Sequence, residues 1–211
     1  MARCCSGYDV VFDDRQARRD LRRYRRKGLS ASARDAVDFA RSHGLDGASV
    51  LEVGGGIGAL QVELLKAGAA RAVNVELSPG YEEVAARLAH DEGIEERVER
   101  RLADFVAAGD SVEPADVVVL NRVVCCYPDY EAMLGTAGAH ARRLLVFTYP
   151  RGGPVTRLLF ATFNLCVRVR GSDFRAYAHP PAELRRAAGA EGLRLVHERP
   201  GLFWQLAAFE R

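Results

Sequence analysis

The chain has 211 residues, of which 48% are hydrophobic and 27% charged, a balance typical of a globular rather than a disordered protein. The formal net charge is only +2, so the composition does not indicate a general affinity for nucleic acid. No apolar run reaches the ~18 residues of a membrane span, and the first residues lack the apolar core of a secretory signal. A cytoplasmic location is therefore expected.

The amino-terminal segment is expected to form an irregular arm over residues 1–11, followed by two helices. Polar residues that favour amino-terminal caps precede each helical pattern, and a glycine follows each one. The helices are expected over about 14–27 and 33–43, with Asp13 or Asp14 and Ser30 or Ser32 as their caps. The first helix carries eight basic residues and one acid between positions 15 and 27. Because its arginines occupy nearly all faces, a solvated lid helix is favoured over a nucleic-acid site.

Strands and helices then alternate, with short connections. This rhythm predicts a parallel sheet that is covered by helices on both faces. The third strand is the most polar, which predicts a position at the sheet edge. Strands are expected over 48–53, 72–76, 98–102, 116–121 and 144–148, and helices over 59–67, 79–91 and 130–140.

The pattern changes after Pro150. An apolar helix is expected over 156–170, an aromatic loop over 172–179 and a further helix over 180–190. Two strands, over 193–199 and 202–210, are separated by a Pro-Gly turn and predict an antiparallel hairpin at the sheet edge. The expected fold is α/β, with a Rossmann-like, doubly wound, seven-stranded sheet and an amino-terminal helical lid. One domain is predicted, comprising a lid (1–44), a cofactor-binding half (45–150) and a substrate-side insertion with the hairpin (151–211).

A glycine-rich turn follows the first strand and organises the expected site. The strand ends at Glu52 and Val53, and four glycines occupy the next five positions: Gly54, Gly55, Gly56 and Gly58. Glycine lets the backbone approach a ligand closely, and the helix that begins near Gly58 directs free N–H groups to the same place. The turn therefore predicts a nucleotide-binding corner.

Acids after the next two strands narrow the choice of ligand. Glu76 ends the second strand, where a carboxylate can accept hydrogen bonds from two ribose hydroxyls. That feature suits a nicotinamide cofactor equally well. The G-x-G-x-G spacing after Glu52, and an acid beside an aromatic at Asp104 and Phe105, favour S-adenosylmethionine instead.

With these motifs, the sequence resembles the class I S-adenosylmethionine-dependent methyltransferases over roughly residues 45–211. The resemblance implies that Glu52 and the glycines contact the methionine end of the cofactor and that Glu76 binds the ribose. It implies further that Leu77 packs beside the adenine, that Asp104 and Phe105 hold it, and that Asn121 lines the methyl-transfer site. S-adenosyl-L-homocysteine would be the product.

The acceptor side is less defined by the sequence. Its lining is expected from residues 121–127, 149–151, the arm at 1–30 and the insertion at 152–179. Candidate bases or orienting groups are Tyr127, Tyr149, Tyr177 and His179. His179 has a ring suited to accepting a proton near neutral pH, although a loop histidine that only hydrogen-bonds a carbonyl is the alternative.

Five cysteines occur, as two adjacent pairs and a single residue. Cys4-Cys5 lies in the arm, Cys125-Cys126 follows the fourth strand, and Cys166 lies in the apolar helix. Packing of small apolar side chains, a redox disulfide and a thiolate metal site are all conceivable, and packing is favoured because adjacent cysteines chelate poorly. No metal site is predicted.

The predicted function is methyl transfer to a small-molecule acceptor, by O-methylation. The stretch from Asn121 to Val124 is similar to bacterial enzymes often grouped with magnesium-protoporphyrin O-methyltransferases. That grouping implies a carboxylate acceptor that pairs with lid arginines. The alternative is a protein that binds S-adenosylmethionine or S-adenosylhomocysteine for regulation, without turnover. Neither nucleic acid nor a membrane span is expected, and the oligomeric state is left open.

Overall fold

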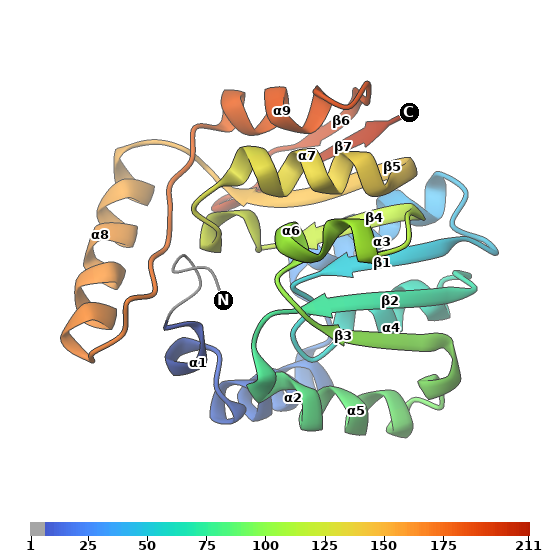
Figure 1. The fold of residues 1–211 in the computed structure, drawn as a ribbon, viewed down its shortest axis with the longest axis horizontal. Coiled ribbons are helices and arrows are strands. Elements are labelled where there is room, and N and C mark those ends of the chain that lie inside the picture. Colours follow the sequence, from blue (N-terminus) through green and yellow to red (C-terminus); the bar gives the residue numbers. More distant parts are fainter. Residues whose placement is uncertain (1–6) are drawn as a thin grey trace.

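The computed structural model describes residues 7–211 as one seven-stranded sheet between two layers of helices (Figure 1). The strand order is β3-β2-β1-β4-β5-β7-β6. The first five strands are parallel, and β7 runs antiparallel to both β5 and β6. The strands are β1 Ser49–Val53, β2 Arg71–Glu76, β3 Val98–Leu102, β4 Ala115–Asn121, β5 Ala141–Pro150, β6 Arg194–Arg199 and β7 Trp204–Glu210. The predicted sheet and its carboxyl-terminal hairpin are confirmed.

Alternating apolar side chains of the central strands form two cores. In β4, Val117 and Val119 pack against the layer formed by α2, α3, α4 and α5, whereas Val118 and Leu120 face α6, α7 and α9. The more polar β3 lies at the sheet edge, as predicted. The helices of the two layers are α2 Asp14–Lys27, α3 Ala31–Ser42, α4 Ala59–Lys66, α5 Glu82–Asp91, α6 Phe105–Ala108, α7 Tyr130–His140 and α9 Pro181–Gly189, with 3-10 turns at Pro79–Tyr81, Glu95–Arg97, Gly109–Ser111 and Val124–Cys126.

Both amino-terminal helices begin at predicted caps. The Asp13 carboxylate accepts a hydrogen bond from the backbone N–H of Gln16 at 2.7 Å. The Ser30 hydroxyl accepts one from the N–H of Ala33 at 3.4 Å. These caps fix where α2 and α3 start and therefore how the segment between them crosses the carboxyl ends of the strands.

Several boundaries differ from the sequence-based expectation. Part of the expected irregular arm is a helical turn, α1 (Tyr8–Val11), which starts at a left-handed Gly7. β5 is longer than expected because Tyr149 and Pro150 still pair with β7. β7 starts later, at Trp204, because residues 200–203 form the turn.

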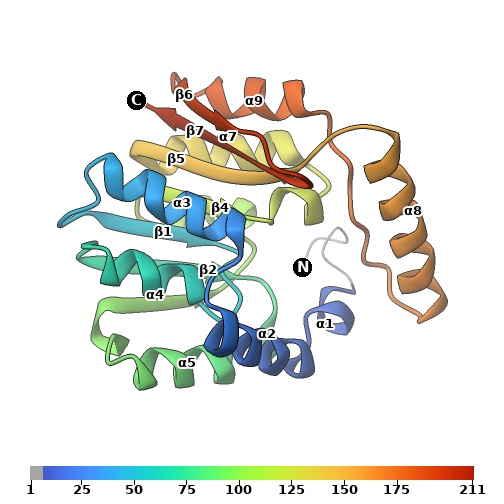
Figure 2. The same cartoon turned by 180° about the vertical axis from the view of Figure 1, so that it is seen from behind.

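One helix stands outside the two layers. α8 (Pro154–Val169) lies beyond the carboxyl ends of the parallel strands and is joined to α9 by an extended segment (Figures 1 and 2). Over residues 7–211, none of the helices combines the length and apolar character needed to cross a bilayer.

Candidate functional site

A cavity of about 310 Å³ opens where the carboxyl ends of β1, β2 and β4 meet the amino-terminal helices. This volume is within the range of ~300–1,000 Å³ that is usual for small-molecule sites. Its walls come from the glycine turn, from the ends of β2, β3 and β4, and from α1 and the α2–α3 segment. The sequence-predicted residues in the lining are Glu52, Gly54, Gly55, Gly56, Glu76, Leu77, Asp104, Phe105, Asn121 and Tyr127.

The glycines of the turn are required by geometry. Gly54, Gly56 and Gly58 have φ angles of 63°, 54° and 78°, in the left-handed region that side chains disfavour. Gly55 is restricted by space instead: an added Cβ would lie 2.0 Å from Asn74 Nδ2 and 2.7 Å from Glu52 Cδ. Gly58 is the amino-terminal cap of α4 and does not line the cavity.

A buried polar cluster supports the turn from below. Glu52 is only 2% exposed, and its carboxyl accepts hydrogen bonds from the Gln61 N–H at 3.2 Å and from Asn74 Nδ2 at 3.3 Å. Asn74 Nδ2 also donates to Gln61 Oε1 at 2.9 Å. Burial raises the pKa of Glu52 to about 8, against the opposing effect of the Arg100 charge. A cationic ligand above the turn would therefore draw the Glu52 carboxyl into its ionised form.

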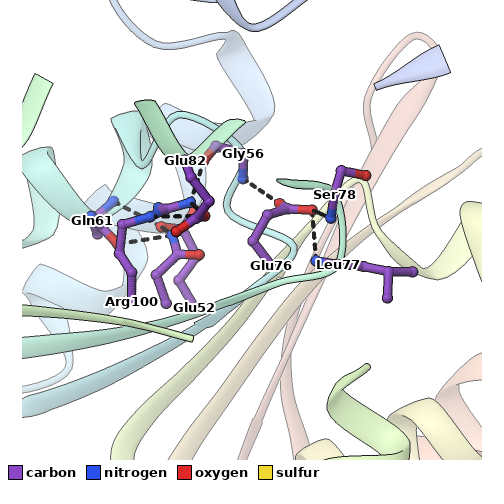
Figure 3. Close-up of polar contacts among 9 residues, drawn as sticks. Glu52, Gly56, Gln61, Glu76, Leu77, Ser78, Glu82 and Arg100 are labelled. Carbon is purple, nitrogen blue, oxygen red and sulfur yellow. Dashed lines mark hydrogen bonds and ion pairs between the residues drawn. The ribbon is translucent and has the colours of Figure 1, made fainter. Parts of the chain in front are cut away.

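The Glu76 carboxylate joins the β1 turn to the β2 turn (Figure 3). One oxygen accepts the N–H groups of Leu77 at 2.8 Å and Ser78 at 2.9 Å, and the other accepts the Gly56 N–H at 2.8 Å. A carboxylate oxygen can accept two hydrogen bonds, so the oxygen bound to Gly56 keeps one acceptor position. Glu76 thus combines a structural role with capacity for one ligand hydroxyl.

Residues of β3 and α5 hold the turn from its outer side. The Arg100 guanidinium donates to the Gly56 carbonyl at 3.2 Å and to Glu82 at 2.7 Å (Figure 3). The Tyr81 ring covers Gly56, and its hydroxyl donates to Asp20 of α2 at 3.0 Å. These contacts tie the amino-terminal helices to the glycine turn. Sequence analysis missed these side chains and the Asn74–Gln61 pair, since no motif spacing marks them.

The cavity has a second carboxylate at the end of β3. Asp104 caps α6 by accepting the Val106 N–H at 3.1 Å, and the Tyr127 hydroxyl donates to the same carboxylate at 3.2 Å. Phe105 is buried beside it. The Tyr127 hydroxyl therefore lies at the Asp104 end of the cavity, where the resemblance implies adenine.

Asn121 and Arg122 line the cavity at the end of β4. Asn121 Oδ1 accepts hydrogen bonds from Thr148 Oγ1 at 3.0 Å and from Ser32 Oγ at 3.4 Å. Arg122 has a left-handed φ of 64°, and its guanidinium lies 4.9 Å from the centre of the Trp204 ring. Within residues 7–211, Arg122 is the one non-glycine residue with positive φ. Such strained backbone is frequent in binding sites.

The remaining candidate bases lie outside the cavity lining. The His179 ring hydrogen-bonds the Tyr127 carbonyl at 2.9 Å and stacks on Tyr177, and burial lowers the pKa of His179. The Tyr149 hydroxyl donates to Glu198 at 3.1 Å on the hairpin side of the sheet. Within the described chain, no residue of 149–179 lines the cavity. The expected contribution of 149–151 and 152–179 to its walls is therefore wrong for this cavity.

The cysteines fall in different environments. Cys125 is buried, Cys126 lines the cavity, Cys166 is exposed, and all three are free thiols. The two adjacent sulfurs are 3.8 Å apart, and the hydrogen bond between them together with burial raises the pKa of Cys126. Across residues 7–211, no three metal-binding side chains cluster. Cys4 and Cys5 lie outside the described residues.

Comparisons with known proteins agree with this geometry. A family model described as a methyltransferase domain matches residues 21–198. No curated protein matches the sequence. The structure of magnesium protoporphyrin IX methyltransferase from Synechocystis PCC 6803, with bound SAH, has 19% identity and a TM-score of 0.71, over 96% of this chain and 99% of that one.

Two further solved structures are similar in fold. An O-methyltransferase family protein from Burkholderia thailandensis has 20% identity and a TM-score of 0.71, over 95% of this chain and 63% of that one. Geranyl diphosphate C-methyltransferase from Streptomyces coelicolor A3(2) has 15% identity and a TM-score of 0.67, over 84% and 78%. Since the family model spans most of the sequence, the chain belongs to the methyltransferase-domain family and has the class I, S-adenosylmethionine-dependent methyltransferase fold.

Proposed function

We propose that the chain transfers a methyl group from S-adenosyl-L-methionine to the oxygen of a small-molecule acceptor. The observation that carries this proposal is the single cavity that joins the glycine turn and Glu76 to Asn121 and Arg122. Donor and acceptor can meet there, at the carboxyl ends of the strands, where open α/β sheets bind ligands.

The donor half of the cavity fits this cofactor. The glycine turn leaves bare backbone at its wall, and Glu76 keeps an acceptor position for a ribose hydroxyl. Glu52 beneath the turn complements the positive charge of the donor's ammonium and sulfonium groups. Asp104 can accept a hydrogen bond from an adenine amino group. We therefore assign the donor to Glu52, the glycines, Glu76, Leu77, Asp104 and Phe105, with Asn121 between donor and acceptor.

The acceptor half carries arginines without acidic partners. Arg122 and Arg23 both line the cavity, and within residues 7–211 neither forms an ion pair with a carboxylate. Burial and the nearby charge of Arg23 lower the pKa of Arg122, so an anion between the two would relieve both effects. An arginine fork binds carboxylates in a defined orientation. We infer a carboxylate-bearing acceptor.

This assignment reduces the chemistry that the chain must supply. S-adenosylmethionine provides an electrophilic methyl group when bound. A carboxylate acceptor is already ionised at neutral pH and needs no general base. The side chains would then act by orienting the acceptor oxygen and excluding water. Tyr127, Tyr149, Tyr177 and His179 remain candidates for a base if the acceptor is a hydroxyl instead.

A methyl-labelled donor tests the proposal. The protein is incubated with labelled S-adenosylmethionine and a panel of carboxylic acids, phenols, amines and thiols, and labelled products are identified by mass spectrometry. We expect methyl esters of one class of carboxylic acid. Transfer only to nitrogen, carbon or sulfur would contradict O-methylation. Cofactor binding without transfer to any compound would favour the regulatory alternative.

A further inference from the structure

The outer face of α8 is an exposed apolar stripe. Eleven large apolar side chains are exposed in the described chain, and six of them belong to this helix of 16 residues. Leu158 is 69% exposed and Val169 79%. The exposed apolar residues recur at spacings of three and four, as on one side of a helix; they are Val155, Leu158, Leu159, Phe163, Leu165 and Val169.

The opposite face of α8 is already used. Thr156 and Val167 are buried, and the Asn164 side chain exchanges two hydrogen bonds with the backbone of Ala176, at 2.8 and 2.9 Å. Phe160 contacts Phe203 of the β6–β7 turn, with ring centres 6.3 Å apart. The helix is thus anchored along its inner face, and in both views none of the elements formed by residues 7–211 lies on its far side (Figures 1 and 2). A helix that is apolar on both faces needs a second surface to cover it.

Positive charge predominates around the stripe, and the nearest acid in the sequence is the exposed Asp173. Residues 151–172 contain four arginines and no acid. All four arginines, at positions 151, 157, 168 and 170, are exposed, and within residues 7–211 none of them forms an ion pair. Leu202, which is 97% exposed, precedes Phe203, whose ring contacts Phe160 on the inner face of α8.

The apolar stripe and the arginines beside it indicate which kind of partner α8 binds. Apolar side chains flanked by exposed arginines are typical of helices that lie in a lipid interface, where anionic headgroups attract the cations. A second copy of the chain is disfavoured, because pairing residues 151–173 with themselves would bring together eight arginines and only two acids. We propose that the outer face of α8 docks the protein on an anionic lipid surface.

The docked helix would lie close to the cavity. Val167 of α8 packs in one apolar cluster with Phe174 and Tyr8, and Tyr8 lines the cavity. One layer of side chains therefore separates the lipid-facing helix from the site. This inference does not depend on the proposed function, since it rests on α8 alone.

Vesicle co-sedimentation of the full chain tests the inference. Vesicles of phosphatidylcholine, alone or mixed with phosphatidylglycerol, are compared at low and high salt. We expect binding to the anionic vesicles only, and weaker binding at high salt. Leu158→Asp with Leu165→Asp should abolish it. Arg157→Gln with Arg168→Gln should weaken it by about tenfold or more, because each arginine near an anionic surface contributes several-fold.

A matched control separates docking from general effects of the substitution. Leu195 is exposed on β6, in the part of the hairpin that pairs with Phe209, and Leu195→Asp should bind vesicles as the unmodified chain does. Circular dichroism melts check that each variant is folded. Absence of binding to anionic vesicles at low salt would overturn the proposal. A dimer in light scattering that Leu158→Asp with Leu165→Asp dissociates, without vesicle binding, would assign the face to a second copy and also overturn it.

Discussion

The glycine turn and the end of β4 differ in how their charged side chains are paired within the protein. At the glycine turn, Glu76 already holds three backbone N–H groups, and Arg100 joins the turn to Glu82. At the end of β4, Arg122 faces the cavity together with Arg23 of α2, and neither forms an ion pair with an acid among residues 7–211. The donor end is therefore built in advance, and the acceptor end leaves charge for a ligand to satisfy.

This contrast follows from the fold. Parallel strands end at one edge, so the β1 and β2 turns can be tied together by short hydrogen bonds from a single side chain. The acceptor end instead combines β4 with α2 and the α2–α3 segment, which come from a distant part of the sequence. Changes at the donor end should therefore affect stability and cofactor binding together. Changes at the acceptor end should affect binding of the acceptor more than binding of the cofactor.

Gly55→Ala should have the largest effect. Its Cβ would lie 2.0 Å from Asn74 Nδ2, in a buried cluster that has no room to move. Overpacking of this kind costs about 1–3 kcal/mol of unfolding free energy. We expect a lower melting temperature and loss of detectable S-adenosylhomocysteine binding by calorimetry.

Gly135→Ala provides the matched control for this prediction. Gly135 lies within α7, and an added Cβ there meets no atom within 4 Å. Alanine in a helix interior is favoured over glycine by about 0.5–1 kcal/mol, so this variant should be as stable as the unmodified chain or more so. Equal stability of Gly55→Ala and Gly135→Ala would contradict the packing described for the turn.

Glu76→Ala should have the second-largest effect. It removes the acceptor of three backbone N–H groups and of the proposed ribose hydroxyl. We expect the binding free energy of S-adenosylhomocysteine to weaken by more than ~1 kcal/mol, which is about a fivefold increase in the dissociation constant. The melting temperature should fall as well. Glu83→Ala, on the exposed side of α5, is the control. An unchanged dissociation constant would refute the ribose assignment.

Substitutions of Arg122 should separate binding from strain. Arg122→Gly and Arg122→Ala both lose the contact between the guanidinium and the Trp204 ring. The φ of 64° suits glycine, so relief of strain should let Arg122→Gly keep the stability of the unmodified chain, whereas Arg122→Ala keeps the strain and should lose about 1 kcal/mol. Both should raise KM for a carboxylate acceptor several-fold, because a charge-assisted hydrogen bond is lost. Unfolding curves and initial rates measure the two effects.

The donor's own carboxylate is the competing ligand for this arginine. If Arg122→Gly weakens the binding of S-adenosylhomocysteine but not that of 5′-methylthioadenosine, which lacks the carboxylate, the arginine binds the donor. An unchanged KM in that variant would exclude the acceptor role.

Glu52 should give the smallest effect, through pH. Burial raises its pKa to about 8, and a bound cation stabilises the ionised form, so affinity should rise as pH increases through this value. Between pH 7.5 and 8.5 we expect the affinity of the unmodified chain for the cofactor to rise about threefold more than that of Glu52→Gln. Titration of the ligand itself affects both chains equally and cancels in this ratio. For folding the sign is opposite: the unliganded chain should lose stability as pH rises from ~5 to 8, since the unfolded carboxyl ionises first. A constant affinity ratio would show that Glu52 does not titrate with the ligand.

The residues proposed for the donor end could be identified from the sequence because they serve the backbone. Gly54 and Gly56 need a left-handed φ, and Glu76 follows a strand at fixed spacing, so each can be recognised from one short segment of the sequence. Asn74 and Arg100 could not be found in this way. Their partners come from other strands and helices, and only the assembled sheet brings them together.

The acceptor end was harder for the same reason. Tyr149 follows a predicted strand and was expected near the site, but β5 continues and the alternation of its side chains places Tyr149 with Phe147 on the α9 face. Arg122 lies directly after Asn121, yet its orientation depends on Trp204 from the hairpin. The exposure of the α8 stripe likewise cannot be read from an apolar helical pattern, which more often marks a core helix.

Calorimetric titration of the unmodified chain with S-adenosyl-L-homocysteine tests the central claim most directly, because it needs no knowledge of the acceptor. The built donor end predicts saturable binding at one site per chain, weakened in Glu76→Ala and unchanged in Glu83→Ala. Absence of binding to both S-adenosyl-L-homocysteine and S-adenosyl-L-methionine, by a folded chain, would contradict it.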